Sequence, residues 1–247
     1  MTSELKQAMG NLPKSSEIKS WTEWFERRAK YYDDPFMKMA YYIDKHPIPI
    51  EVMLATIEDA WKKLRATNEC NLLDVGGGVG LFTQAFQSRL RHIITTDVSF
   101  TMVQDAHELN PKGTFFVCEA AALPFVSCCF DRLICYSVFH YFSDLSHARK
   151  TLIEFVRVVK NGGLMIIGDV PLHKQQGERK HTCEAIVERS IYYPASLEHN
   201  LKQLTYEPEF FIEFCTANGH NYEVLSQEIK GKLSSSSRFD VRIKVIK

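Results

Sequence analysis

The sequence predicts one α/β domain built on a mostly parallel sheet that helices cover on both faces. Short apolar runs typical of strands alternate with helical patterns from residue 71 onward, and the first of these runs ends in a glycine-rich turn. The chain has 247 residues, of which 45% are hydrophobic, so it can bury one sizeable core, and two independent domains are not expected.

The first part of the chain is expected to be helical. Residues 1–16 are polar, and apolar side chains then recur at helical spacing in two segments. The first segment carries Trp21, Trp24, Phe25, Ala29 and Tyr32, and the second carries Ile50, Met53, Leu54, Ile57, Trp61 and Leu64. We therefore expect a helical extension over residues 1–65, followed by the main domain over residues 66–247.

The alternation of strands and helices then runs through most of the main domain. Asn110-Pro111 stops one of the helical patterns, and the glycines of the segment Asn161-Gly162-Gly163 stop another. We expect strands at 71–75, 92–97, 114–118, 131–136 and 164–170, and helices at 81–90, 101–109 and 147–159. This order predicts a parallel sheet wound on both faces.

Residues 171–206 interrupt the alternation. They are polar and charged, with apolar residues at helical spacing at Ile186, Val187 and Ile191, and then at Leu197, Leu201 and Leu204. We interpret them as a helical insertion that forms a lid. A helix at 208–218 and two strands at 222–229 and 239–246 close the chain, and the short flexible loop GKLSSSSR between these strands predicts that they pair antiparallel.

The strongest chemical signal is a run of glycines where the first strand meets a helix. Glycine lets the backbone approach a ligand closely, and a helix N-terminus favours a carboxylate or phosphate. An acid that closes the next strand, Asp97, lies 21 residues after the first glycine and can accept both hydroxyls of a ribose. The run consists of Asp74, Gly76, Gly77, Gly78 and Gly80, with Val75 and Val79 between them.

This run differs from the dinucleotide-binding pattern GxGxxG. Gly76 and Gly78 fit that pattern, but its sixth position is Leu81. The absence of glycine there argues against a nicotinamide-dependent oxidoreductase, which would use the same kind of sheet.

The run resembles motif I of the class I methyltransferases that use S-adenosylmethionine. Three further segments extend the resemblance over about residues 66–247: Glu119-Ala120 followed by Leu123-Pro124-Phe125, Phe130-Asp131, and Lys160 to Gly163. The resemblance implies a Rossmann-like, doubly wound, seven-stranded sheet with one antiparallel strand. It also implies S-adenosyl-L-methionine as the cofactor and S-adenosyl-L-homocysteine as its product.

The same resemblance assigns cofactor contacts. Asp97, with Val98 beside it, would bind the ribose, and Glu119, which replaces the family's usual Asp, would approach the adenine together with Ala120. Asp74 would contact the ligand or only brace the turn. Tyr136 would line the cofactor pocket. The segment from Ala29 to Asp33 resembles a family pattern that would bring the Tyr32 hydroxyl to the cofactor carboxylate, although Tyr32 also fits an aromatic core stripe.

Catalytic residues are harder to assign, because methyl transfer mainly needs alignment and exclusion of water. His140 after the fourth strand is the best candidate for a general base, since its unperturbed pKa lies near neutrality. Asp169 after the fifth strand is the candidate for holding the acceptor. Either residue can also have a purely structural role, and we interpret His173 and His181 as surface residues.

The composition limits the class of methyl acceptor and the cellular compartment that we expect. Thirty basic and thirty acidic residues cancel, seven cysteines show no framework spacing, and no stretch has the length of a membrane span. We expect a cytoplasmic monomer or homodimer that binds no metal, nucleic acid or membrane and methylates a small molecule, with a biosynthetic metabolite as the default acceptor. The alternatives are a methyltransferase acting on protein or tRNA, and a non-catalytic member that binds the cofactor.

Overall fold

The computed structural model describes residues 18–43, 46–173 and 201–247. The chain divides into two compact units, one formed by residues 1–47 and 175–202 and the other by residues 48–174 and 203–247. The helix α4 (Ile50–Leu64), which the sequence analysis assigned to the N-terminal extension, belongs to the larger unit. The predicted division into an extension over residues 1–65 and a main domain over residues 66–247 stays a prediction.

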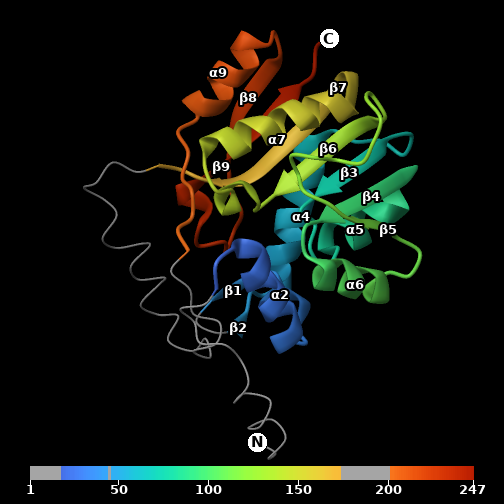
Figure 1. Cartoon of the computed structure of the whole chain (residues 1–247), viewed down its shortest axis with the longest axis vertical. Helices are drawn as coiled ribbons and strands as arrows, with labels where there is room; N and C mark the ends of the chain where they lie inside the picture. The colour runs from blue at the N-terminus through green and yellow to red at the C-terminus, as the bar shows by residue number, and fades with distance from the viewer. Residues whose placement is uncertain (1–17, 44–45, 174–200) are drawn as a thin grey trace, which may run out of the picture. The chain divides into compact units, whose positions relative to one another are not determined.

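The larger unit is built on a seven-stranded sheet (Figure 1). Its strand order is β5-β4-β3-β6-β7-β9-β8, and β9 runs antiparallel to the other six strands. The sheet therefore has the predicted seven strands and the predicted single antiparallel strand. The strands are β3 (Asn71–Val75), β4 (His92–Asp97), β5 (Thr114–Val117), β6 (Phe130–Tyr136), β7 (Val159–Pro171), β8 (Asn221–Ser226) and β9 (Arg238–Lys244).

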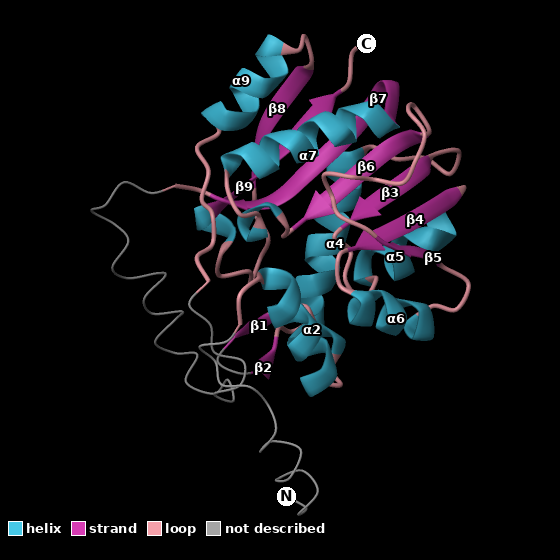
Figure 2. Ribbon diagram, in the orientation of Figure 1, coloured by secondary structure: helices cyan, strands magenta, loops and turns pink. Residues whose placement is uncertain are grey.

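Helices cover both faces of this sheet, as Figure 2 shows for α7 and α9 in front of the strands and α4 and α5 behind them. The remaining helices of the unit are α5 (Leu81–Phe86), α6 (Phe100–Leu109), α7 (Leu145–Val158) and α9 (Glu209–Ala217). Three short 3-10 helices are η2 (Gln87–Arg89), η3 (Phe139–Tyr141) and η5 (Ser235–Ser237). The doubly covered sheet encloses a core in which the side chains of Leu133, Phe155 and Phe211 are fully buried.

The helix α7 illustrates how the sequence sets these elements. The side chain of Asp144 accepts the backbone N–H of His147 at 2.8 Å and so caps the N-terminus. Ala148, Leu152 and Phe155 recur at helical spacing and are fully buried on the sheet. The helix ends at Val158 and β7 starts at the next residue, so the segment 161–163 lies inside the strand, not before it as predicted.

Parallel pairing brings the ends of successive strands to one edge of the sheet. β3 pairs in parallel with β4 and β6, and β6 pairs in parallel with β7. The glycine turn after β3, Asp97 at the end of β4, and Tyr136 at the end of β6 therefore lie along the same carboxyl edge. Open α/β sheets bind their ligands at this edge.

The smaller unit contains α2 (Trp21–Tyr31), α3 (Pro35–Lys38) and a hairpin of β1 (Tyr42–Ile43) and β2 (His46–Pro47). Its centre is Arg28, which is fully buried. The Arg28 guanidinium lies 4.8 Å from the ring centroids of Trp24 and Tyr32 and 5.2 Å from that of Tyr42. Such cation–π contacts compensate in part for burying the charge. The sequence analysis predicted α2 but not the hairpin.

The predicted lid helix lies mostly outside the described residues, because residues 174–200 are not among them. Within the described part, Leu201 and Leu204 do not lie in a helix, so their helical spacing was misleading. Instead, the backbone N–H of Leu204 donates to the carbonyl of His140, and Leu172 bridges Tyr206. Among the helices that the structure describes, none combines the length and apolar character needed to cross a membrane.

Candidate active site

The glycine turn between β3 and α5 is tied to β4. The backbone N–H groups of Gly76 and Gly77 both donate to the carbonyl oxygen of Thr96, at 2.7 and 3.0 Å. Gly76 has φ +71°, in the left-handed region that favours glycine. A Cβ on Gly77 would clash with the side chain of Thr95 and lie 2.6 Å from Asp74 Oδ2. The turn therefore requires glycine at both positions.

Asp97 at the end of β4 holds the far side of the turn. Its Oδ2 accepts the backbone N–H of Gly78 at 2.9 Å, and its Oδ1 accepts that of Ser99 at 2.9 Å. Because the residue is partly exposed, an approaching ligand can offer this carboxylate donors such as ribose hydroxyls. A hydrogen-bond acceptor at this position fits the ribose of the predicted cofactor.

Asp74 lies beneath the turn. Only 2% of the residue is exposed, and its Oδ2 accepts the hydroxyl of Thr83 at 3.2 Å. Burial raises the pKa of Asp74 to about 7; the hydrogen bond from Thr83 lowers it, while the charge of Asp97 raises it further. This position supports the interpretation that Asp74 braces the turn over the one in which it contacts ligand. Gly80, the last glycine of the run, is the residue before the first turn of α5.

The residues predicted to surround adenine lie next to Asp97, because β5 pairs with β4. Val98 is 41% exposed. Glu119 follows β5 and is exposed, and its Oε1 lies 3.0 Å from the Nε2 of His147 on α7. Ala120 is partly exposed and packs on the core. Adenine binding by Glu119 would therefore compete with this contact to His147, and the assignment stays a prediction.

The ends of β6 and β7 carry two strained residues that contact each other. Ser137 and Asp169 adopt φ +59° and +58°, which is unusual for residues other than glycine, and the Ser137 hydroxyl donates to Asp169 Oδ2. The backbone N–H of Asp169 donates to Asp240 Oδ1 at 2.8 Å. Backbone strain of this kind persists only where the surroundings enforce it, and it concentrates at functional sites.

Lys232 joins this pair from the loop between β8 and β9. Its ammonium group lies 2.7 Å from Asp169 Oδ1, 3.1 Å from Gln227 Oε1 and 3.2 Å from the hydroxyl of Tyr136. Burial disfavours the Asp169 carboxylate, but the charges of Lys232 and Arg238 outweigh it and hold the pKa of Asp169 below its ordinary value. The segment predicted as a flexible loop is thus anchored at the carboxyl edge of the sheet.

Tyr136 is enclosed by the same network. The residue is 4% exposed, its ring packs against that of Phe82 at 5.1 Å, and its hydroxyl accepts the side-chain N–H of Gln227 at 3.2 Å. The predicted role of Tyr136 in lining the cofactor pocket is not tested by these contacts. The contacts with Phe82 and Gln227 do hold the Tyr136 ring at the end of β6, next to Ser137.

His140, the predicted general base, is buried with 3% exposure in η3. Burial and the charge of Arg238 lower the pKa of His140 well below its usual value, so the ring is neutral at neutral pH. Its Nδ1 lies 3.4 Å from Nη1 of Arg238, which is always a donor, so this nitrogen is the acceptor of the ring. A neutral ring meets one requirement of a base, but this nitrogen faces a cation.

Tyr32 belongs to the smaller unit. Its ring stacks on the Arg28 guanidinium and contacts the Tyr31 ring at a centroid distance of 4.8 Å, and burial raises the pKa of its hydroxyl. These contacts agree with the aromatic-stripe interpretation. The predicted contact of Tyr32 with the cofactor carboxylate stays a prediction.

Sequence reasoning missed several residues of this network. Ser137 stood within the segment we examined after the fourth strand, but a positive φ at serine has no sequence signature. Gln227, Lys232 and Arg238 come from segments 58 to 69 residues further along the chain, and no spacing rule connects them to Asp169. In the described part of the chain, no group of three or more His, Cys, Asp or Glu residues could hold a metal ion.

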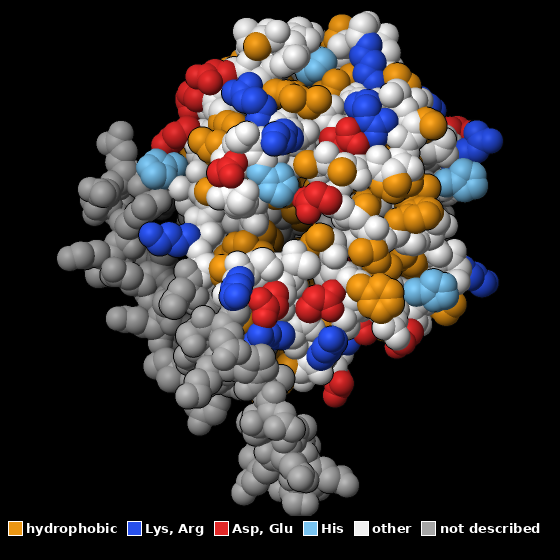
Figure 3. Space-filling view, in the orientation of Figure 1, with side chains coloured by type: hydrophobic (Ala, Val, Ile, Leu, Met, Phe, Trp, Pro, Cys, Tyr) orange, Lys and Arg blue, Asp and Glu red, His pale blue; other side chains and the backbone are white. Residues whose placement is uncertain are grey.

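The face of the molecule in Figure 3 shows basic and acidic side chains interspersed. This mixture agrees with the zero formal net charge of the chain. A field of one sign, which would attract a phosphate backbone, does not dominate that face.

Comparison with known proteins places this geometry in context. Residues 73–167 match a family described as a methyltransferase domain. The chain is 25% identical over 169 residues to a ubiquinone/menaquinone biosynthesis C-methyltransferase of Bordetella parapertussis, covering 64% of this chain and 59% of that protein. It is 33% identical over 112 residues to an uncharacterized methyltransferase of Bacillus subtilis, covering 42% and 43%. The chain thus spans less than two thirds of the length of these curated relatives.

Solved structures share the fold at low sequence identity. A Haemonchus contortus phosphoethanolamine N-methyltransferase, solved with phosphoethanolamine and S-adenosylhomocysteine, superposes with a TM-score of 0.66 at 12% identity, covering 100% of this chain and 50% of that one. An amino pentose methyltransferase from Micromonospora echinaspora, bound to S-adenosylmethionine, gives a TM-score of 0.58 at 13% identity, covering 77% and 90%.

Proposed function

We propose that this chain, which belongs to the class I S-adenosylmethionine-dependent methyltransferase family, transfers a methyl group from S-adenosylmethionine to an oxygen, nitrogen or carbon atom of a small molecule. The observation that carries the proposal is the bond between the glycine turn and Asp97. Through this bond, the carboxylate of Asp97, a partly exposed residue, lies beside the glycine turn. Both lie at the edge of the sheet where open α/β folds bind their ligands.

The residues of the carboxyl edge would divide the work of binding. Asp97 would accept the ribose hydroxyls, and Val98, Glu119 and Ala120 would surround the adenine. Gly76 and Gly77 would let the cofactor approach the backbone because no side chain intervenes. The glycine turn and Asp97 are held in place by the pairing of β3 with β4 and by the bond from Gly78 to Asp97, so a ligand would not have to order this part of the proposed site.

The bound cofactor supplies an electrophilic methyl group on a sulfonium whose leaving group is a neutral thioether. The protein then mainly aligns the acceptor and excludes water. A base is needed only for an acceptor that arrives protonated. Asp169 is the candidate to hold such an acceptor, which would have to share its carboxylate with Ser137 and Lys232. His140 is the candidate to take a proton, which would have to displace the contact of its acceptor nitrogen with Arg238.

A small-molecule acceptor is supported by the charge pattern and by relatives. Basic and acidic residues balance, and relatives are named for methylating quinone precursors or an acyl-carrier-bound malonyl group. The solved structures include enzymes named for phosphoethanolamine and an amino pentose. These names differ in their methylated atom, so the class of acceptor is proposed and the atom is left open.

The test is methyl transfer from cofactor labelled in its methyl group. The purified protein is incubated with S-adenosylmethionine and a cell extract separated into small-molecule, protein and RNA fractions, and the Asp97→Ala variant serves as the control. We expect label in the small-molecule fraction with the wild type alone. Label confined to protein or RNA would assign a macromolecular acceptor, and cofactor binding without any labelled product would identify a non-catalytic member.

A further inference from the structure

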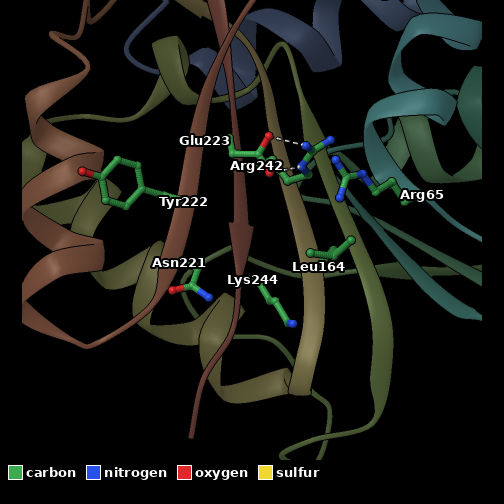
Figure 4. Close-up of a pocket in the computed structure, with 7 residues that line it drawn as sticks. All are labelled: Arg65, Leu164, Asn221, Tyr222, Glu223, Arg242 and Lys244. Atoms are coloured by element: carbon green, nitrogen blue, oxygen red, sulfur yellow. Dashed lines mark hydrogen bonds and ion pairs between the residues drawn. The ribbon is translucent and has the colours of Figure 1, made fainter.

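A groove of about 160 Å³ lies over β7, β8 and β9 of the sheet (Figure 4). Three basic side chains line it, those of Arg65, Arg242 and Lys244, against one acidic side chain, that of Glu223. In a chain whose formal net charge is zero, this is a local excess of positive charge.

The register of the strands places the groove at the amino edge of the parallel strands. Asn221 on β8 pairs with Lys244 on β9, Lys244 pairs with Leu164 on β7, and Leu164 pairs with Arg132 on β6. Paired residues point to the same face of a sheet. Arg132 is the third residue of β6, whereas Tyr136 at the proposed active site is its last. The groove is therefore separate from the proposed active site.

Two of the cations at this edge already have partners. Arg242 binds the Glu223 carboxylate through Nε and Nη2, and its Nη1 donates to the carbonyl of Lys63 at 3.2 Å. Arg132 donates to the carbonyls of Leu64 and Arg65. Both guanidinium groups thus satisfy carbonyls at the C-terminal end of α4, which has no further turn to bind them.

Among the described residues, the side chains of Arg65 and Lys244 have no such partners. Within the described residues, neither the side chain of Arg65 nor that of Lys244 forms an ion pair or a side-chain hydrogen bond, and the Asn221 amide forms none either. Figure 4 shows Arg65 reaching toward the pair of Glu223 and Arg242. The hydrogen bond from Arg242 lowers the pKa of Glu223, and the charges of Arg242 and Arg65 lower it further.

The backbones that carry these side chains are fixed. Arg65 is the C-terminal cap of α4 in the left-handed conformation, with φ +48°, and its carbonyl accepts two bonds from Arg132. Lys244 and Asn221 are held by their pairing across β8 and β9. A ligand that bridges them would therefore not have to order the backbone, although it would still order the long side chains.

We propose that this groove binds a dianionic oxyanion of the phosphate class, held by the Arg65 guanidinium, the Lys244 ammonium and the Asn221 amide. A phosphate group offers several strong acceptor oxygens and nearly two negative charges at neutral pH, which match two cations and one neutral donor. Arginine binds phosphate through paired N–H groups and lysine binds it as a point charge. The pair of Arg242 and Glu223 forms the wall beside the ligand.

The test is titration of inorganic phosphate into the full chain, followed by the backbone amide shifts of the groove residues at constant ionic strength. Arg65→Gln and Lys244→Gln each remove one charge, and Lys150→Gln removes an exposed charge on α7 as the matched control. Losing a charge-assisted hydrogen bond weakens binding by about tenfold or more. We expect saturable shifts in the wild type and in Lys150→Gln, and this weakening in the other two variants.

A second titration distinguishes a phosphate monoester from free phosphate as the source of the anion. O-phosphoserine and inorganic phosphate are compared in the same titration, and tighter binding of the former identifies a phosphate monoester as the ligand class. The proposal is overturned by shifts that do not saturate in the wild type, or by equal affinity in the wild type and both groove variants. Titration of S-adenosylhomocysteine into each variant reports on the separate cofactor site and shows that the fold is intact.

Discussion

The backbone N–H of Gly78 donates a hydrogen bond of 2.9 Å to Asp97 Oδ2 and so joins two neighbouring strand ends. Gly78 belongs to the turn after β3, and Asp97 is the last residue of β4. The same carboxylate accepts the N–H of Ser99, whose hydroxyl caps α6 by accepting the N–H of Met102 at 3.1 Å. One acid therefore fixes the glycine turn and the start of the next helix while it remains partly exposed.

Replacing Gly77 by Ala should disrupt this turn. The added Cβ would lie 2.6 Å from Asp74 Oδ2 and clash with Thr95, and overpacking of this kind costs about 1–3 kcal/mol of the free energy of unfolding. We expect a lower midpoint of thermal unfolding and weaker binding of S-adenosylhomocysteine. Gly162→Ala is the control for cofactor binding, because its Cβ would meet no atom within 4 Å and the residue lies in β7 outside the turn; its φ of +77° makes alanine lower stability there as well, so the two variants are compared in cofactor affinity. Equal cofactor affinity in Gly77→Ala and wild type would refute the argument.

Asp74 should make the stability of the protein depend on pH. Its pKa is about 7 in the folded protein, mainly through burial, and is near 4 when unfolded. Between these values the folded state binds the extra proton, so the stability that Asp74 contributes is greatest below about pH 4 and is lost as the pH rises through about 7.

The isosteric variant Asp74→Asn cannot titrate and should lack this component. Denaturant unfolding of both proteins at pH 5 and pH 8 measures it, because the other titrating groups cancel in the difference. We expect Asp74→Asn to gain stability relative to the wild type between pH 5 and pH 8. A difference that is the same at both pH values would show that Asp74 is already ionised at pH 5.

Lys232 and Asp169 should behave as one unit. Removing the cation alone, in Lys232→Met, leaves a buried carboxylate without the cation that forms an ion pair with it, which costs about 3–5 kcal/mol. Adding Asp169→Asn removes that charge, and asparagine tolerates the positive φ of this position. We expect the double variant to be more stable than Lys232→Met alone. Lys230→Met, on the same loop and exposed, is the control and should change stability little.

The strands of the sheet were predictable because their signals are local. Residues 71–75 and 92–97 were predicted with the bounds that β3 and β4 have, since each is an apolar run closed by a turn or an acid. Asp97 was found because its distance from Gly76 along the chain is set by the helical segment and the strand that lie between them. Local sequence patterns were therefore sufficient to predict the glycine turn and Asp97.

The rest of the candidate site depends on contacts that no local pattern encodes. The ion pair of Lys232 with Asp169 spans 63 residues and depends on how the loop after β8 folds back. The burial of His140 comes from its packing, so the sequence could suggest a base but not its surroundings. The helical spacing of Leu201 and Leu204 was misleading because this segment instead pairs with the residues after β7 and η3.

The most direct test of the account is calorimetric titration of S-adenosylhomocysteine into the wild type and Asp97→Ala, with Glu108→Ala on the exposed face of α6 as the control. Losing the acceptor of two ribose hydroxyls removes charge-assisted hydrogen bonds worth about 1.5–3 kcal/mol each. The account predicts saturable binding to the wild type and Glu108→Ala, and at least about a tenfold loss in Asp97→Ala. Binding of equal strength to all three proteins would contradict it.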